Sequence, residues 1–208
     1  MNDNDNENDA FSPETAVMLL IDHQVGTMSW VSSIGLAEMK RNALALAKAA
    51  KAVDIPLLLT SSMEDDAQGP LLSEFQDIAP AEFAGRYRRH GVVDALDDAA
   101  LSAAVQATGR KHLIIAGVTN DVCTVFPTLT ALRRGFQVHV VVDAGGSPSK
   151  IADDAAIRRM EQAGAITGST NQVLAELAGS WTSEVGGKIV PIVMSLVPQP
   201  QPQPQPQS

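Results

Sequence analysis

Three kinds of side chain that can do chemistry follow apolar segments of the chain: a thiol, a carboxylate and a cluster of guanidinium groups. Cys123, the only cysteine among the 208 residues, comes a few positions after the apolar run HLIIAGV. Asp22 directly follows the run AVMLLI, and the segment RYRR contains Arg86, Arg88 and Arg89. A carboxylate in a partly desolvated cleft can take a proton from a thiol, and an arginine can stabilise the resulting charges.

Each of these residues also has an ordinary structural interpretation. An aspartate at a strand end often caps the next turn, an isolated cysteine is usually a small buried hydrophobe, and a run of charges is usually a solvated surface. The chemical interpretation therefore requires Asp22, Cys123 and one of the arginines to meet in a single cleft. Position in the sequence does not decide between the two interpretations.

The segment around Cys123 predicts how a nucleophile would be activated. A cysteine near the start of a helix lies among unpaired backbone N–H groups at the positive end of the helix dipole, and both favour the thiolate. The same N–H groups can bind an oxyanion. Pro127 lacks an N–H and conflicts with the carbonyl of Cys123, so the helix starts after Cys123 or is kinked beside it.

Other catalytic signatures are missing from the sequence. There is no glycine-rich dinucleotide motif, no P-loop and no G-x-S-x-G nucleophile elbow. The four histidines, His23, His90, His112 and His139, are dispersed, and no cluster has metal-ligand spacing. We therefore expect neither a metal nor another cofactor.

The charge and cysteine content restrict the classes of partner and compartment. A formal net charge of −9 argues against non-specific binding to nucleic acid or to anionic membranes. A single cysteine excludes an internal disulfide, as expected in a reducing compartment. No apolar run approaches the roughly 20 residues that cross a bilayer, and the acidic start MNDNDNENDA is unlike a secretory signal. These features predict a soluble, cytoplasmic protein.

The composition divides the chain into one domain between two low-complexity ends. Residues 1–12 are rich in Asn and Asp and are expected to be disordered. Residues 13–197 are expected to form a single domain, with an aliphatic core because aromatic residues are 4% of the chain. Residues 198–208 repeat Pro and Gln and predict an extended, polyproline-like tail.

Within the domain, apolar runs alternate with helical patterns. Near-continuous apolar strands separated by helices are typical of a doubly wound, Rossmann-like α/β fold, in which helices cover both faces of a parallel sheet. Ligands of such folds bind beyond the carboxyl ends of the strands, where Asp22, the arginines and Cys123 are expected to lie. The predicted strands are residues 16–21, 55–60, 84–88, 111–118, 137–143 and 165–167, and the predicted helices are 36–53, 97–108, a segment ending at 134, 150–162 and 171–178.

The motifs LLIDHQVG around Asp22, IIAGVTNDVC around Cys123 and DAGG from Asp143 together resemble the isochorismatase-like cysteine hydrolase superfamily, over about residues 14–180. Within it, the chain looks like an octameric, YcaC-like branch of uncertain substrate. The resemblance implies a six-stranded parallel sheet with helices on both faces, and a homo-oligomer. The apolar segment 188–197, which contains Pro191, either covers another subunit or packs back on the core.

Carried over position by position, the resemblance implies a catalytic triad. Asp22 matches the base that deprotonates the nucleophile, Cys123 matches the nucleophile, and Arg89 stands where most members have lysine. Val118 and Thr119 match a cis peptide bond that aims the Thr119 N–H, together with that of Cys123, at the oxyanion. The implied reaction is hydrolysis of a small amide, carbamoyl or related C–N compound through a thioester intermediate.

The chain departs from better understood relatives near positions expected to contact the substrate. Nicotinamidases have an Asp-x-His metal motif where this chain has Ser62-Met63-Glu64, and Asn120 replaces a common threonine. A metal-bound nicotinamidase is therefore not expected. We expect His23, Glu64 and Asn120 to contribute to substrate binding.

Two alternatives remain open on the same fold. A vinyl ether hydrolase of the isochorismatase type need not use the cysteine, so it would lose activity on Asp22→Asn but not on Cys123→Ser. A catalytically idle binding protein would keep Cys123 as a packed thiol that reacts slowly and unselectively. A phosphoryl-transfer site based on Asp22 is disfavoured, because His23 and Gln24 do not supply a second acid for Mg²⁺.

Overall fold

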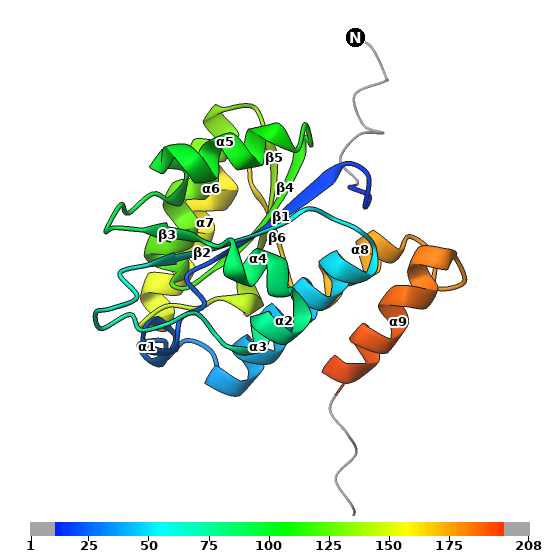
Figure 1. Ribbon diagram of the computed structural model, residues 1–208, viewed down its shortest axis with the longest axis horizontal. Helices are drawn as coiled ribbons and strands as arrows, with labels where there is room; N and C mark the ends of the chain where they lie inside the picture. The colour runs from blue at the N-terminus through cyan, green and yellow to red at the C-terminus, as the bar shows by residue number, and fades with distance from the viewer. Residues whose placement is uncertain (1–10, 198–208) are drawn as a thin grey trace, which may run out of the picture.

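Six parallel strands form one sheet in the computed structural model, which describes residues 11–197 (Figure 1). Their order is β3-β2-β1-β4-β5-β6, which confirms the predicted doubly wound, Rossmann-like fold. The strands are β1 (Ala16–Ile21), β2 (Leu57–Ser62), β3 (Tyr87–Arg89), β4 (His112–Gly117), β5 (Gln137–Val141) and β6 (Ile166–Gly168). The helices are α1 (Val25–Ser29), α2 (Leu36–Ala52), α3 (Glu74–Ile78), α4 (Pro80–Ala84), α5 (Ala99–Ala107), α6 (Val125–Arg133), α7 (Lys150–Gln162), α8 (Thr170–Ala178) and α9 (Glu184–Leu196).

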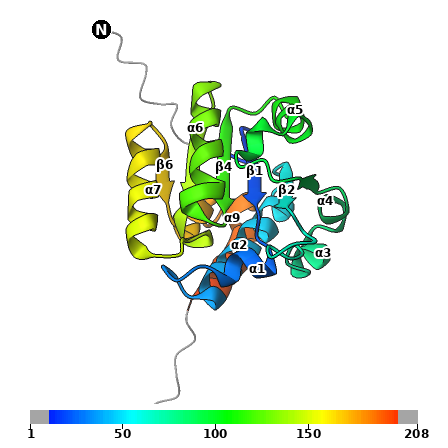
Figure 2. The ribbon, with the colours of Figure 1, turned by 90° about the vertical axis from the view of Figure 1, so that its left-hand side faces the viewer.

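The two faces of the sheet bury separate apolar cores. Successive side chains of a strand point to opposite faces, so Met18 of β1 lies in the core formed with α2, α8 and α9, whereas Leu19 lies in the core formed with α5, α6 and α7. Figures 1 and 2 show these two groups of helices on opposite sides of the sheet. Every residue of β1 is buried, which explains why this strand is a continuous apolar run.

The strand order reverses between β1 and β4, in the middle of the sheet. From β1 the sheet continues to β2 and β3, and from β4 it continues to β5 and β6. Ile21 at the end of β1 pairs with Thr60 of β2 and with Gly117 of β4, and Ser62 pairs with Arg89 at the end of β3. The residues that follow β1 and β4 therefore meet the last residue of β3 at one edge of the sheet, where doubly wound folds bind ligands.

The structure adds short helices to the predicted elements and moves one strand. β3 lies at Tyr87–Arg89 rather than at 84–88, because Pro80 starts α4 and the helix takes up the residues before Gly85. α1, α3 and α4 have five residues each, which is too short to show a helical period in the sequence.

The two ends of the described chain both pack on the core. α9 lies against α8 and α2, with Ile189 fully buried, so the C-terminal apolar segment does pack back, one of the two predicted outcomes. Phe11 is buried and its ring meets that of His139 edge-on, so ordered structure begins before the predicted boundary at residue 13. The rest of the predicted terminal segments, residues 1–10 and 198–208, lies outside the described residues. No helix between residues 11 and 197 has the length and apolar character needed to cross a membrane.

Candidate active site

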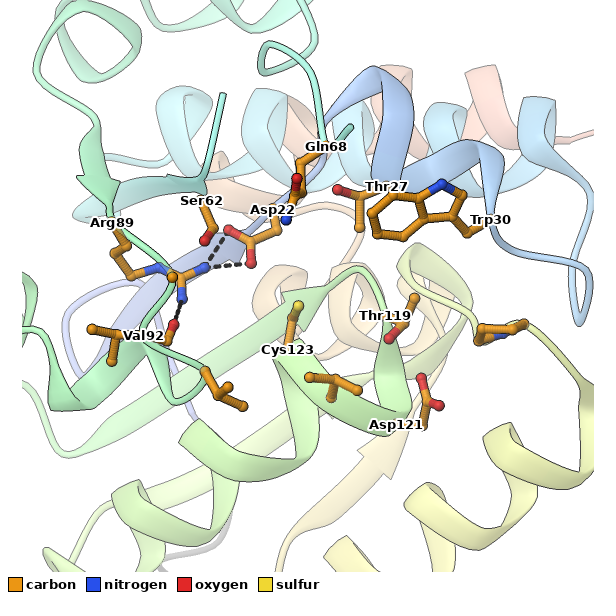
Figure 3. A pocket seen from close by; sticks show the side chains of 14 residues that line it. Asp22, Thr27, Trp30, Ser62, Gln68, Arg89, Val92, Thr119, Asp121 and Cys123 are labelled. Carbon is orange, nitrogen blue, oxygen red and sulfur yellow. Dashed lines mark hydrogen bonds and ion pairs between the residues drawn. The ribbon is translucent and has the colours of Figure 1, made fainter. Parts of the chain in front are cut away.

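A cavity of about 300 Å³ opens at the carboxyl edge of the sheet, beside the point where the strand order reverses (Figure 3). Its volume is at the small end of the range for sites that bind small molecules. Asp22, Arg89 and Cys123 all line it, although they come from three separate parts of the sequence. The structure thus brings together the three residues that sequence analysis proposed for catalysis.

Asp22 enters the cavity through an uncommon backbone conformation directly after β1. Its φ angle of 56° lies in the left-handed region, which residues other than glycine rarely adopt. Two hydrogen bonds hold this turn: the Asp22 N–H donates to the Thr60 carbonyl at 2.9 Å, and the Gln24 N–H donates to the Asp22 carbonyl at 2.7 Å. Because Asp22 is 2% exposed, its carboxylate needs partners within the protein.

Arg89 is the partner of the Asp22 carboxylate. Its Nη2 donates to both carboxylate oxygens, and the two side chains point toward each other in Figure 3. The rest of the guanidinium is held by the protein, since Nε donates to Thr60 Oγ1 at 3.0 Å and Nη1 donates to the Val92 carbonyl at 2.6 Å. Contacts on three sides fix the plane of the guanidinium and leave it no freedom to turn toward another anion.

The environment of Asp22 suits a proton acceptor. Burial raises the pKa of Asp22 above the ordinary value of an aspartate, while the charge and the hydrogen bonds of Arg89 oppose this shift. A carboxylate with a raised pKa binds a proton more strongly, which is what a general base for a thiol requires.

Cys123 lies between β4 and α6, in a single π-helical turn formed by Asn120–Thr124. Pro127 accounts for this interruption because it has no N–H to donate to the Cys123 carbonyl, so the regular helix begins only after the cysteine. This is one of the two arrangements that the sequence allows. Figure 3 shows the Cys123 side chain pointing into the cavity toward Asp22.

The surroundings of the Cys123 thiol favour its protonated form more than the start of a helix alone would. Burial raises the pKa of the thiol well above its ordinary range, and the negative charge of Asp22 raises it further. The backbone N–H of Thr119 and the charge of Arg89 act in the opposite direction with smaller effect. The thiol and the Asp22 carboxylate line the same cavity, and the Cys123 side chain points toward Asp22 (Figure 3).

The peptide bond between Val118 and Thr119 is cis, the arrangement that the resemblance implies. Thr119 follows β4 and lines the cavity, and its backbone N–H interacts with the sulfur of Cys123. An N–H donor beside the sulfur has the chemistry needed to bind negative charge on a carbonyl oxygen under attack there.

Two of the three residues expected to bind substrate are buried behind the cavity. His23 has no exposed surface; its Nε2–H donates to the Ala144 carbonyl at 2.8 Å, and burial lowers its pKa to about 4. Asn120 is equally buried, and its Nδ2 donates to the Val142 carbonyl at 3.1 Å and to Asp153 Oδ1 at 3.0 Å. Both residues therefore shape the turns that carry Asp22 and Cys123 and do not line the cavity.

Glu64, the third expected substrate contact, lines a neighbouring hollow instead. It accepts hydrogen bonds from Arg86 Nε at 2.6 Å and from Arg86 Nη2 at 2.8 Å, and Arg88 approaches it at 3.4 Å. Arg86 and Arg88 are thus turned away from the cavity, which leaves Arg89 as the arginine of this cluster that reaches it. Within residues 11–197, no group of three or more His, Cys, Asp or Glu side chains is placed to hold a metal ion.

The remaining walls of the cavity are formed by residues that no sequence motif singled out. Thr27 and Trp30 come from α1 and its end, Val92 and Val93 from the loop after β3, and Asp121 from the π-helical turn. One signal was present in the sequence, since Trp30 is one of two tryptophans in a chain poor in aromatic residues. In the structure Trp30 and Val93 are exposed, as apolar residues around a binding site often are.

Known proteins share both the sequence and the fold of this chain. Residues 16–172 match the model of the isochorismatase domain. The chain is 40% identical over 174 residues to the probable hydrolase YcaC of Escherichia coli, covering 83% of this chain and 82% of that protein. The structure of Escherichia coli YcaC, described as an octameric hydrolase of unknown specificity, matches with a TM-score of 0.85 at 37% identity, covering 90% of this chain and 91% of that chain. YcaC from Pseudomonas aeruginosa, solved with hexane-2,5-diol and covalent acrylamide, matches with a TM-score of 0.82 at 40% identity, covering 90% and 95%.

Proposed function

The chain belongs to the isochorismatase family and is a YcaC-like hydrolase, and from this premise we propose that Cys123 performs the hydrolysis of a small amide, carbamoyl or related C–N compound. In this proposal Asp22 is the base and Arg89 is the cation that positions it. Thr119 and Cys123 supply the N–H groups that bind the oxyanion. The observation that carries the proposal is that the Cys123 side chain points toward the buried Asp22 carboxylate in a shared cavity (Figure 3).

The first step transfers a proton from sulfur to carboxylate as the sulfur attacks the substrate carbonyl. Both pKa values are raised, so Asp22 binds a proton more strongly than an ordinary aspartate and the thiol releases one less readily. When Asp22 accepts the proton it becomes neutral, and the positive charge of Arg89 is then free to stabilise the attacking sulfur. Arginine stays protonated in proteins, so its role is electrostatic.

The later steps return the same proton. Attack places negative charge on the carbonyl oxygen, where the N–H groups of Thr119 and Cys123 bind it. The C–N bond breaks as protonated Asp22 gives its proton to the leaving amine, which leaves a thioester on Cys123. Asp22 then takes a proton from a water molecule that attacks the thioester. The departing sulfur recovers a proton from Asp22, and the thiol is restored.

The relative from Pseudomonas aeruginosa supports a nucleophile in this family branch. That protein was solved with covalent acrylamide. Acrylamide combines an electrophilic double bond with an amide group, and thiols are the side chains that attack it most readily. In the present chain Cys123 is the only cysteine, which supports its assignment as the nucleophile.

We further infer that the chain forms a homo-oligomer, because Escherichia coli YcaC is described as octameric. Two exposed apolar side chains support this inference: Ile151 at the start of α7 is 83% exposed, and Met194 of α9 is 57% exposed. A second copy that covered such groups would remove apolar surface from water. The cytoplasmic location stays a prediction from the sequence.

A screen of small amides, ureas and carbamoyl compounds tests the proposed reaction. We expect wild type to release amine or ammonia, and Cys123→Ala to release none while its thermal unfolding stays close to that of wild type. Turnover by Cys123→Ala at the wild-type rate would contradict the proposal. Activity that survives Cys123→Ser but not Asp22→Asn would indicate the vinyl ether alternative instead. An idle protein would show no turnover, and its thiol would react without preference among reagents.

A further inference from the structure

The cavity contains one cation, and its charge is already balanced. Among the described residues that line the cavity, Arg89 is the only Lys, Arg or His side chain. It is 2% exposed, and each of its three nitrogens donates to a protein atom. Its positive charge lies against Asp22. A carboxylate on a substrate would therefore enter a low-dielectric space without meeting a free cation.

Asp121 adds a second, unbalanced negative charge to the same cavity. It lies in the π-helical turn two residues before Cys123 and lines the cavity. Its Oδ1 is buried and has no hydrogen-bond partner among the described residues. The proposed mechanism does not use this group. Because no described donor meets this oxygen, the negative charge of Asp121 is left to act on a ligand in the cavity that its side chain lines.

The opposite side of the cavity is suited to the same kind of ligand. Figure 3 shows Thr27 and Trp30 on one side and Thr119 and Asp121 on the other. Thr27 lines this side and carries no charge that would repel a cation. Trp30 presents an indole ring to the cavity, and the face of such a ring attracts cations.

We propose that this cavity selects small amides that carry an amine, protonated at neutral pH, and that Asp121 is the specificity-determining residue. Substrates of the same size that carry a carboxylate are rejected, because they meet Asp121 and a guanidinium already paired with Asp22. The identity of the scissile bond rests on the proposed function, whereas the charge preference rests on the cavity alone. The two can therefore fail separately.

Reagents that differ only in charge test the preference directly. Cys123 is the single cysteine, so thiol modification of the whole chain reports on this cavity. We would measure by intact mass the rates of reaction with methyl, 2-aminoethyl and 2-sulfonatoethyl methanethiosulfonate, which are neutral, cationic and anionic. Each rate is divided by that of 2-mercaptoethanol with the same reagent. The cationic reagent should exceed the anionic one by about tenfold or more, as expected for one unit charge nearby in a partly desolvated space.

Two variants separate the effect of Asp121 from the net negative charge of the chain. Asp121→Asn should lower the cation-to-anion ratio by about tenfold, and comparing reagents on one variant cancels any change in the pKa of the thiol. Asp54→Asn removes the same charge from an exposed residue that precedes β2, at the other end of the sheet, and should leave the ratio as in wild type. Its φ of 57° suits asparagine as well as aspartate, so the control is conservative.

The outcomes are decisive in both directions. A wild-type ratio near one, or faster reaction with the anionic reagent, overturns the proposal whatever the variants do. If Asp121→Asn keeps the cationic preference, the preference comes from the net charge of the chain. The proposed role of Asp121 is then wrong. Should Asp121→Asn not fold, Asp121→Ser gives the same comparison. Turnover of β-alaninamide but not of succinamate would extend the charge preference to substrates. If Cys123→Ala still turned over β-alaninamide, the proposed mechanism would be refuted but the charge preference would stand.

Discussion

One guanidinium nitrogen of Arg89 donates to both carboxylate oxygens of Asp22, although the residues are 67 positions apart and each is 2% exposed. The pair reaches from the end of β3 to the end of β1, and Thr60 of the intervening strand β2 accepts a hydrogen bond from Nε. A buried ion pair adds little net stability when complete, but removing one member leaves an uncompensated buried charge. The pair therefore connects the proposed base to the integrity of the fold.

Removal of the guanidinium should be costly. In Arg89→Met, the Asp22 carboxylate is left buried without its cation, so we expect the free energy of unfolding to fall by about 3–5 kcal/mol. Hydrolysis should be lost with it. Arg89→Lys keeps the charge but not the two-oxygen contact, and should lose less of both. Urea unfolding and amide turnover on the same samples measure the two effects.

Arg88 offers a matched control one residue away. Its side chain is 62% exposed, so Arg88→Met should change the free energy of unfolding by no more than about 0.5 kcal/mol. If Arg89→Met were as stable as Arg88→Met, the fold would not depend on the ion pair between Arg89 and Asp22.

The pH dependence of the reaction should reflect the raised pKa of Asp22. The base acts only when deprotonated, so kcat/KM should fall as the pH drops through a value above the ordinary range of an aspartate. The carboxyl group of Arg89→Lys has weaker hydrogen bonding to its charged form, so its acid limb should move to still higher pH. An acid limb at the ordinary pKa of an aspartate would speak against Asp22 as the base.

The Cys123 thiol should ionise at a higher pH than an ordinary thiol. Because burial and the charge of Asp22 raise its pKa, the rate of labelling by iodoacetamide should keep rising beyond pH 9.0, the ordinary value for a thiol. In Asp22→Asn the charge is gone and the rise should occur at lower pH. A plateau of the wild-type rate below pH 9.0 would show that the sulfur is a thiolate at rest.

His23 should make the protein less stable in acid. Its pKa is about 4 in the folded chain and 6.5 ordinarily, so between these values the unfolded chain binds more protons. The free energy of unfolding should therefore fall as the pH drops from 6.5 to 4, by up to about 3 kcal/mol from this residue. His23→Gln should remove that part of the slope, and His90→Gln, at an exposed position, should not. Equal slopes in the two variants, measured by urea unfolding, would contradict the assignment.

Asn120 should act as a positioning residue for the nucleophile. Its Nδ2 donates to Asp153 Oδ1, which also accepts from the Ser147 hydroxyl at 2.7 Å, so the side chain ties the π-helical turn to α7. We expect Asn120→Ala to cost about 2 kcal/mol in stability and to lower kcat more than it raises KM. Asn171→Ala, on the exposed side of α8, is the control and should change neither. A pure loss of stability with unchanged kcat would make Asn120 merely structural.

The central strands were predictable because a strand buried on both faces is a continuous apolar run in the sequence. The bounds of β1 and α7 coincide with the predicted segments, and β1 was recognisable as a continuous apolar run. Ser149 accepts a hydrogen bond from the Ala152 N–H and marks the start of α7. Pro191 had the opposite effect. It lies at an exposed position inside α9, and a proline in a sequence argues against a helix. Packing against α8 and α2 stabilises the helix nevertheless.

The candidate site was only partly predictable. Asp22, Arg89 and Cys123 stand at or near strand ends, and parallel strands bring such residues to one edge. Thr27 and Trp30 depend instead on α1, whose first N–H groups are held by the carbonyls of Pro70 and Gln68 from a distant loop. No local pattern encodes that contact. The state of the thiol was also beyond the sequence, because it depends on how deeply the sulfur is buried.

A thiol whose pKa is raised by burial and by a neighbouring carboxylate is a poor target for peroxide, since oxidants attack thiolates far faster than thiols. The chain has no second cysteine with which an oxidised Cys123 could form an internal disulfide. The raised pKa of the thiol, and not an internal disulfide, therefore limits the oxidation of Cys123. On the proposed mechanism, we expect oxidative inactivation to be fastest during turnover, when Asp22 withdraws the proton from the sulfur.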